Sequence, residues 1–352
     1  MGFIDKALER RPGLKSALLR RGARLLGATA VKNFAQEHSR WYKAGIDAHD
    51  ASGPYACQRL RRSLFVPAVE PRFRISKADR MFAVGSCFAR GIEQVLQKSG
   101  FQMESAARDF DRFEVADDRK LAPLTFTNKY TTYSILNELT WALQPGAMFP
   151  EASLVDLDAG RCIDPHVSPA LKLVGREGTL ERRRIITDVT RRIKDCRVLF
   201  LTLGLVETWY DARAEVHLNA TPIKEMHDLH PKRYEFVRSS YLQNMDNMEK
   251  LHELLTAHAH PDLHIIVTTS PVPMVATYTG KDVVVANNYS KATLCAVAQD
   301  WAEAHDNTQY FPSYEIVMNS GRDIAWEEDM RHVTGGMTRH VMDAFMEAFV
   351  EK

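Results

Sequence analysis

The chain has 352 residues, 45% of them hydrophobic, so it is long enough to bury a large core. Its 46 basic and 45 acidic residues leave a net charge of +1, which argues against nucleic acid as a partner. Five widely spaced cysteines without a C-x-x-C pair indicate neither a disulfide framework nor a zinc site. No stretch approaches the ~20 apolar residues of a membrane span, and none reads as a signal peptide. We therefore expect a cytoplasmic protein without metal or cofactor, whose oligomeric state the sequence leaves open.

The N-terminal segment departs from this even composition. Residues 1–24 contain seven basic and two acidic side chains, and leucines recur there at helical spacing. A basic amphipathic helix of this kind suits the anionic inner surface of a membrane or a protein partner, while packing on its own domain or a mobile arm fits equally well. We expect residues 1–54 to form an extension, with residues 1–40 as its contact surface, ahead of a domain over residues 55–352.

Beyond this extension, strands alternate with helices, and the strands are continuous apolar runs. Strands are predicted at residues 80–84, 198–203, 264–268 and 309–311. Helices are predicted at residues 88–98, 131–142, 241–257, 286–304 and 335–349. Continuous apolar strands are typical of a parallel sheet covered on both faces. Residues 104–195 are less regular, with a mixed stretch at 145–187, and read as an insertion that would shape substrate choice.

A serine lies at the corner where the first strand turns into a helix. Gly85-Ser86 ends the strand, and such a turn lifts a side chain to the open edge of a sheet, where helical N–H groups can stabilise an oxyanion. Glycine before the serine keeps the corner uncrowded. Ser86 is therefore a candidate nucleophile, although Gly-Ser is also an ordinary helix entry in which the serine only caps the helix.

A second candidate group lies near the other end of the chain. Asp329 precedes His332 by three residues, just before the last predicted helix. In a doubly wound α/β fold this pair and Ser86 would converge at one sheet edge. A serine nucleophile needs a base, and the base needs an orienting group. We expect a triad in which His332 is the general base and Asp329 holds its tautomer.

The motif Gly85-Ser86-Cys87-Phe88-Ala89 resembles the motif that names the GSCFA-domain proteins. Further blocks similar to that family follow in its order, at residues 128–131, 203–209, 270–273, 286–291 and 310–315. The resemblance covers roughly residues 55–345. These proteins are placed with the SGNH/GDSL-type serine hydrolases, which implies a flavodoxin-like three-layer α/β/α sandwich with a mainly parallel sheet and a serine triad.

The resemblance also indicates where an oxyanion hole would lie. The Ser86 N–H would supply one donor, and in SGNH hydrolases a glycine N–H and an asparagine side chain supply the others. Here Val206 stands at the place of that asparagine, between Gly204 and Glu207. Asn128 is a candidate substitute donor. Glu207, with Trp209, either contacts substrate or orients a catalytic group; the alternative for Glu207 is a buried ion pair with an arginine.

Three other side-chain patterns suggest competing chemistry. The histidines at 227–230 and 258–264 concentrate metal ligands, but histidines two apart in a loop meet zinc geometry poorly. Cys87 could itself attack a substrate, but we expect it to pack as a small buried thiol. Ser290 and Lys291 suggest a dyad, yet adjacent residues on a helix point ~100° apart.

The resulting functional prediction is a serine esterase or acyltransferase. Its substrate would be an O-acylated saccharide or a similar polar ester, processed through an acyl-Ser86 intermediate. Because Val206 replaces the expected asparagine, a carbohydrate-binding or interaction module without turnover is the alternative, and a Cys87-dependent thioesterase is a lesser one. The acyl group, the acceptor and the choice between hydrolysis and transfer stay open.

Overall fold

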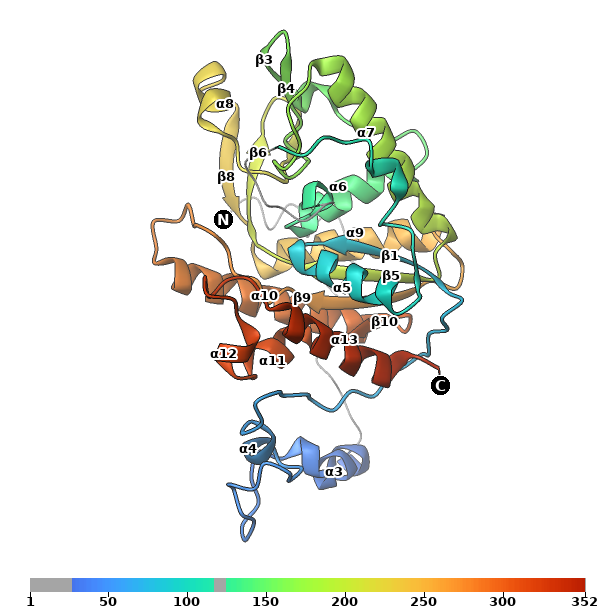
Figure 1. The fold of residues 1–352 in the computed structure, drawn as a ribbon, viewed down its shortest axis with the longest axis vertical. Helices are drawn as coiled ribbons and strands as arrows, with labels where there is room; N and C mark the ends of the chain where they lie inside the picture. Colours follow the sequence, from blue (N-terminus) through green and yellow to red (C-terminus); the bar gives the residue numbers. More distant parts are fainter. Residues whose placement is uncertain (1–26, 117–124, 352) are drawn as a thin grey trace. The chain divides into compact units, whose positions relative to one another are not determined.

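The computed structural model describes residues 27–116 and 125–351 (Figure 1). Its contacts divide the chain into two compact units, Met1–Ala68 and Val69–Lys352. From the sequence we placed the boundary at 54–55. The basic helix expected within residues 1–24 lies outside the described residues.

The described part of the first unit is small and mostly helical. It contains α3 (Gly27–Ala35), η1 (Glu37–Ser39) and α4 (Ala56–Arg59). Gln58 is buried and donates from its amide to the Asp47 carbonyl at 2.8 Å, which ties α4 to the preceding loop. Across all described residues of the chain, no helix combines the length and apolar character needed to cross a membrane.

A five-stranded parallel sheet forms the centre of the second unit. The strands are β1 (Arg80–Gly85), β2 (Gln102–Met103), β5 (Val198–Leu203), β9 (His264–Thr269) and β10 (Thr308–Tyr310), in the order β2-β1-β5-β9-β10. Four of these strands confirm the prediction to within one residue at each end. The edge strand β2 was missed because two residues carry no readable period.

Helices cover both faces of this sheet and make a three-layer α/β/α sandwich, as predicted. One face packs against α5 (Cys87–Lys98), α11 (Ser313–Met318), α12 (Arg322–Ala325) and α13 (Gly335–Phe349). The other layer contains α6 (Thr132–Leu143), α9 (Tyr241–His258) and α10 (Val283–Ala304) (Figure 1). Buried leucine, isoleucine and valine residues fill the strands between them, which is why these strands read as continuous apolar runs.

The irregular region between β2 and β5 is more ordered than the sequence suggested. It holds η2 (Arg108–Phe110), η3 (Thr125–Thr127), α6, η4 (Glu151–Ser153), the hairpin of β3 (Val155–Asp158) and β4 (Arg161–Ile163), α7 (Arg176–Arg191) and η5 (Arg192–Asp195). The expectation of a mixed stretch over residues 145–187 was wrong for α7. This helix buries only a narrow stripe, part of it polar, so its hydrophobic period is weak.

A second, antiparallel sheet follows β5 and was not predicted. It consists of β6 (Glu207–Asp211), β7 (Val216–His217) and β8 (Tyr234–Arg238), which lie in the order β7-β6-β8. Along the chain, α8 (Lys224–Leu229) lies between β7 and β8. Its strands mix polar and aromatic residues and are only partly buried. Such strands give a weak alternating pattern in sequence.

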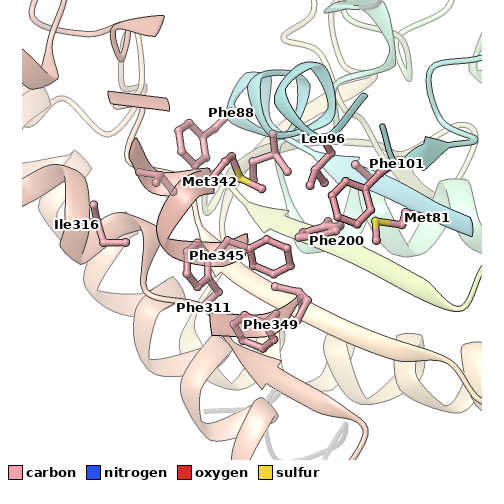
Figure 2. Close-up of a cluster of buried hydrophobic side chains, with 14 of the residues drawn as sticks. Met81, Phe88, Leu96, Phe101, Phe200, Phe311, Ile316, Met342, Phe345 and Phe349 are labelled. Carbon is pink, nitrogen blue, oxygen red and sulfur yellow. The ribbon is translucent and has the colours of Figure 1, made fainter. Parts of the chain in front are cut away.

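Aromatic side chains from distant segments form the core under α13 (Figure 2). Phe345 is fully buried, with ring centroids 5.1 Å from Phe200 of β5, 5.4 Å from Phe311 and 4.9 Å from Phe349. These contacts attach the C-terminal helix to the middle of the sheet. The loop that carries Asp329 and His332 enters this helix, so the core also fixes one end of that loop.

Replacing Phe345 with alanine should lower the free energy of unfolding by about 3–5 kcal/mol, because a buried ring is removed and a cavity remains. Urea unfolding followed by circular dichroism measures this change. Met148→Ala is the matched control: the side chain is 83% exposed, and its loss should change stability by less than about 0.5 kcal/mol. A loss below about 1 kcal/mol for Phe345→Ala would contradict this account of the core.

Candidate active site

Ser86 lies at the carboxyl end of β1, between that strand and α5. In the order β2-β1-β5-β9-β10 the chain reverses its direction of growth at β1 and β5, and ligands of doubly wound folds bind at such a switch point. Ser86 occupies the N-cap position of α5, but its side chain makes no capping hydrogen bond. Its Oγ is buried without a hydrogen-bond partner among the described residues. The hydroxyl is therefore not used to cap the helix.

Two glycines allow the chain to crowd around Ser86. Gly85 has φ of +144°, and a Cβ there would lie 2.3 Å from the Thr202 carbonyl oxygen. A Cβ on Gly204 would lie 2.8 Å from the Tyr130 carbonyl oxygen and 3.3 Å from Ser86 Cβ. Side chains at these two positions would separate the strand ends from each other and from the segment that crosses them.

The crossing segment, residues 128–131, is hydrogen-bonded to both strand ends. The Lys129 N–H donates to the Gly85 carbonyl at 2.7 Å, and the Leu205 N–H donates to the Tyr130 carbonyl at 2.7 Å. The Tyr130 N–H in turn donates to Asn219 Oδ1 at 3.0 Å. Asn128 is only 2% exposed, and its Oδ1 has no partner among the described residues. The segment thus holds the candidate donor Asn128 beside the strand end that carries Ser86.

The backbone donors differ from the expectation in one respect. The Ser86 N–H, predicted to face an oxyanion, donates to the Thr202 carbonyl at 3.3 Å because pairing of β1 with β5 continues one residue past the strand. Within the described ranges the Gly204 N–H has no acceptor, so it is the better placed donor next to Ser86. Val206 is buried and offers no side-chain donor, and its backbone bonds to Ser290 and Ser239.

Asp329 and His332 form a bonded pair in a tight loop before α13. The His332 Nδ1 lies 2.5 Å from Asp329 Oδ2, as expected for an oriented imidazole. Asp329 Oδ1 accepts the backbone N–H groups of Arg331 and His332, each at 2.9 Å. These two amides, and then the imidazole, lower the pKa of Asp329. Met330 between them has φ of +53°, a left-handed conformation that the aspartate turn sustains.

The hydrogen bond that we expected between Ser86 and His332 is absent. His332 Nε2 lies instead 2.9 Å from Nη1 of Arg331, and Ser86 Oγ has no partner. The side chains of His332 and Asp329 are 53% and 49% exposed, whereas Ser86 is 4% exposed. The physical reason is local: the guanidinium of the adjacent residue, Arg331, is a charged donor, and it bonds to the lone pair of His332 Nε2.

Glu207 contacts the loop that follows β9. It accepts hydrogen bonds from Thr277 Oγ1 at 2.7 Å and from the Tyr278 N–H at 3.1 Å. The alternative of a buried ion pair with an arginine is wrong, since no such pair involves Glu207 among the described residues. Trp209 packs edge-on against Tyr278, with ring centroids 5.2 Å apart. Both residues hold the loop after β9 in place.

Lys291 is a buried residue of the site that the sequence analysis did not select. Its Nζ donates to the Gly204 carbonyl at 2.9 Å and to the Val272 carbonyl at 2.8 Å. Burial lowers its pKa to about 7. Ser290 instead bonds to the Val206 N–H at 3.2 Å, so Ser290 and Lys291 have separate partners and form no dyad. The available signal was a lysine on a helix face that otherwise buries mainly apolar side chains, among them Leu294 and Trp301.

Cys87 is a packed thiol rather than a reactive one. It is partly buried against the core cluster under α13. Burial raises its pKa, an effect that the nearby charges of Arg331 and Lys291 oppose. A raised thiol pKa reduces the thiolate population on which cysteine nucleophiles depend. Lys291 is attached to the same corner by its hydrogen bond to the Gly204 carbonyl.

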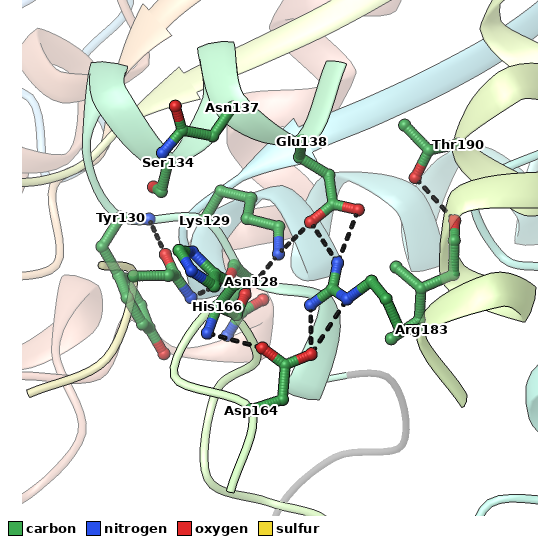
Figure 3. A network of polar contacts seen from close by, with 12 residues as sticks. Asn128, Lys129, Tyr130, Ser134, Asn137, Glu138, Asp164, His166, Arg183 and Thr190 are labelled. Atoms are coloured by element: carbon green, nitrogen blue, oxygen red, sulfur yellow. Dashed lines mark hydrogen bonds and ion pairs between the residues drawn. The ribbon is translucent and has the colours of Figure 1, made fainter. Parts of the chain in front are cut away.

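A buried ionic network is attached to the segment 128–131 through Lys129 (Figure 3). Glu138 of α6 pairs with Lys129 at 2.7 Å and with Arg183 of α7 at 2.9 Å, and Arg183 also reaches Asp164 at 2.5 Å. Burial alone would raise the pKa of Glu138, but Arg183 and Lys129 hold it at about 2. Four charged residues far apart in sequence gave no local signal of this network.

The histidine clusters do not assemble into a metal centre in the described part of the chain. No three side chains of the His, Cys, Asp or Glu type come together there. The His227 ring packs against Trp209 and Tyr234, with centroids 5.4 and 5.6 Å away.

Comparison with known families gives one match. The model of the GSCFA family matches residues 80–345, more than half of the chain. This range includes Ser86 and the Asp329–His332 pair. No curated protein matches the chain.

His166, beside the ionic network, should make folding pH-dependent. It is 1% exposed, neither ring nitrogen has a partner among the described residues, and burial lowers its pKa to about 3. Between pH 6.5 and about 3 the unfolded chain therefore binds a proton that the folded chain does not. As the pH is lowered through this window, this group should therefore decrease the free energy of unfolding by up to about 1.4 kcal/mol per pH unit.

His166→Phe keeps a ring against Trp141 and Phe149 and should flatten this slope by about one proton. Urea unfolding at a series of pH values measures it. His258→Phe, at the end of α9, is the control and should keep the wild-type slope. An equal slope in wild type and His166→Phe would show that His166 is not buried in its neutral form.

Proposed function

Because the chain belongs to the GSCFA family, we propose that it is a serine esterase or acyltransferase of the SGNH type that works through an acyl-Ser86 intermediate. The observation that carries this proposal is the buried Ser86 hydroxyl, which has no structural hydrogen bond at the switch point of the sheet. A serine held there only for stability would use its hydroxyl to cap α5. The Asp329–His332 pair supports the proposal, since its geometry leaves Nε2 as the basic nitrogen.

In the proposed reaction, His332 Nε2 takes the proton of Ser86 Oγ as the oxygen attacks the acyl carbon. The tetrahedral intermediate collapses, and the same proton passes from His332 to the departing alkoxide. Water or a sugar hydroxyl then attacks the acyl-serine with His332 again as base. Asp329 stabilises the imidazolium and holds its Nδ1 proton.

The oxyanion would be stabilised mainly by the Gly204 N–H and the side chain of Asn128. Gly204 directly follows β5, a Cβ there would lie 3.3 Å from Ser86 Cβ, and its carbonyl accepts a hydrogen bond from Lys291. Asn128 replaces the donor that Val206 cannot provide. One donor of this kind contributes about 3 kcal/mol to the transition state, so a two-donor hole sustains useful rates. The proposed substrate is an O-acylated saccharide or a similar polar ester.

A binding module without turnover is the second candidate. The observation that favours it is the contact of His332 Nε2 with Arg331 in place of Ser86. In such a module, loss of Ser86 or His332 would leave ligand affinity intact. A Cys87-dependent thioesterase is less well supported, because burial raises the pKa of this thiol.

A fluorophosphonate probe should form a single adduct on Ser86, read by mass spectrometry of the modified peptide. Ser86→Ala should abolish the adduct, and Cys87→Ala should keep it because the thiol is not the nucleophile. The reverse pattern would establish the thioesterase. Absence of any adduct on correctly folded protein would favour the binding module.

Loss of the base should slow this modification without unfolding the protein. His332→Ala and Asp329→Asn should each reduce the rate of Ser86 modification at least ~100-fold, since a positioned base and its tautomer contribute 10²–10⁴. Stopped-time labelling gives the rate, and circular dichroism checks the fold. The exposed His38→Ala is the control. Unchanged labelling rates in both variants would contradict the proposed triad.

A further inference from the structure

The Arg331 guanidinium is hydrogen-bonded to Nε2, the basic nitrogen of His332. A guanidinium has only donors and keeps its charge at all ordinary pH values. Its Nη1, 2.9 Å from His332 Nε2, can bond only to a neutral imidazole whose proton is on Nδ1, facing Asp329. This is the tautomer that a general base requires, but its lone pair is already used. As long as this contact persists, His332 is a weaker base toward a serine.

The Arg331 guanidinium also lacks a carboxylate partner. The three fully buried arginines of the same unit, Arg90, Arg183 and Arg233, each pair with at least one acid. Among the described residues none pairs with Arg331, and its Nε is buried without an acceptor. A buried donor left unsatisfied destabilises the folded state. An anion at the edge of the guanidinium, in its plane, would satisfy such donors with two parallel hydrogen bonds.

The groups around Arg331 leave its guanidinium without an anionic partner. Buried Lys291 donates to the carbonyls of Gly204 and Val272 and pairs with no carboxylate among the described residues. The loop carries three acids, Glu327, Glu328 and Asp329, and among the described residues none of them forms an ion pair with Arg331. Asp329 is bonded through both oxygens to the backbone and to His332. A guanidinium that no local carboxylate pairs with can bind an anionic ligand. Arg331 itself is partly exposed and can be reached from solvent.

Resting on the proposed function of Ser86, we propose that Arg331 binds an anionic group of the substrate, a carboxylate or a phosphate, and that this binding withdraws the guanidinium from His332. The base is then released only when the correct substrate is present. Loop movement is not required for this exchange, because the His332 carbonyl is held by the Glu327 N–H at 2.8 Å and the loop ends pair at Trp326 and Val333. Side-chain rotation of Arg331 suffices.

Two matched esters test the carboxylate form of this proposal. 4-Nitrophenyl hemisuccinate and 4-nitrophenyl butyrate have acyl chains of equal length, and only the first carries a carboxylate. Wild type should prefer the hemisuccinate in kcat/KM by at least tenfold. Arg331→Gln should lose this preference, with a lower rate on the hemisuccinate and a higher rate on the butyrate because His332 is freed. Arg331→Lys should keep part of it, and the exposed Arg339→Gln should behave as wild type.

A spectroscopic measurement tests the phosphate form and needs no turnover. In protein carrying ¹⁵N-histidine, addition of inorganic phosphate should shift the His332 Nε2 resonance in wild type and not in Arg331→Gln. A shift without a hemisuccinate preference identifies a phosphate-bearing substrate. If neither the preference nor the shift is observed, the proposal is overturned.

These outcomes separate the two proposals. A fluorophosphonate adduct on Ser86 with no anion effect leaves the esterase proposal standing and overturns the role of Arg331. A phosphate-induced shift of His332 without any adduct on Ser86 keeps the anion site at Arg331 and removes the esterase.

Discussion

Lys129 joins the site to the body of the protein. Its backbone N–H is bonded to the Gly85 carbonyl at the end of β1, and its buried ammonium is paired with Glu138 in α6. Through Glu138 the same network reaches Arg183 in α7 and Asp164 after the β3–β4 hairpin. The inserted region between β2 and β5 is thereby tied to the strand end that carries Ser86. A buried pair of this kind is costly to break, because removal of one partner leaves an uncompensated charge.

The charges around the site follow two different patterns. In the ionic network attached to the segment 128–131, the buried cations Lys129 and Arg183 each pair with a carboxylate, and these pairs hold the segment rigidly. At the Ser86 corner, Lys291 is held by backbone carbonyls and Arg331 by the imidazole of His332. Paired charges stabilise a single arrangement, whereas a cation with a neutral partner can exchange it for an anion. This contrast is the physical basis for separating structural from ligand-binding groups here.

The sequence predicted the central fold well and the accessory parts poorly. Strands such as residues 198–203 are uniformly apolar, and helices such as residues 335–349 have a clear period, so both were placed to within a residue or two. The three-stranded sheet around Trp209 and the helix at Arg176–Arg191 were missed, because their buried faces are narrow or partly polar. Tertiary contacts, rather than local pattern, stabilise these elements.

By itself the sequence determined the corner at Gly85-Ser86 and the Asp329–His332 pair, since a strand-to-helix turn and a three-residue spacing are local features. Only the tertiary structure decided which partners those groups have. It directed the Ser86 N–H to Thr202, left the Ser86 hydroxyl without a partner, and placed Lys291 on Gly204. The physical reason is that hydrogen bonds and charge pairs act over a few ångströms in space, and distances along the chain do not specify them.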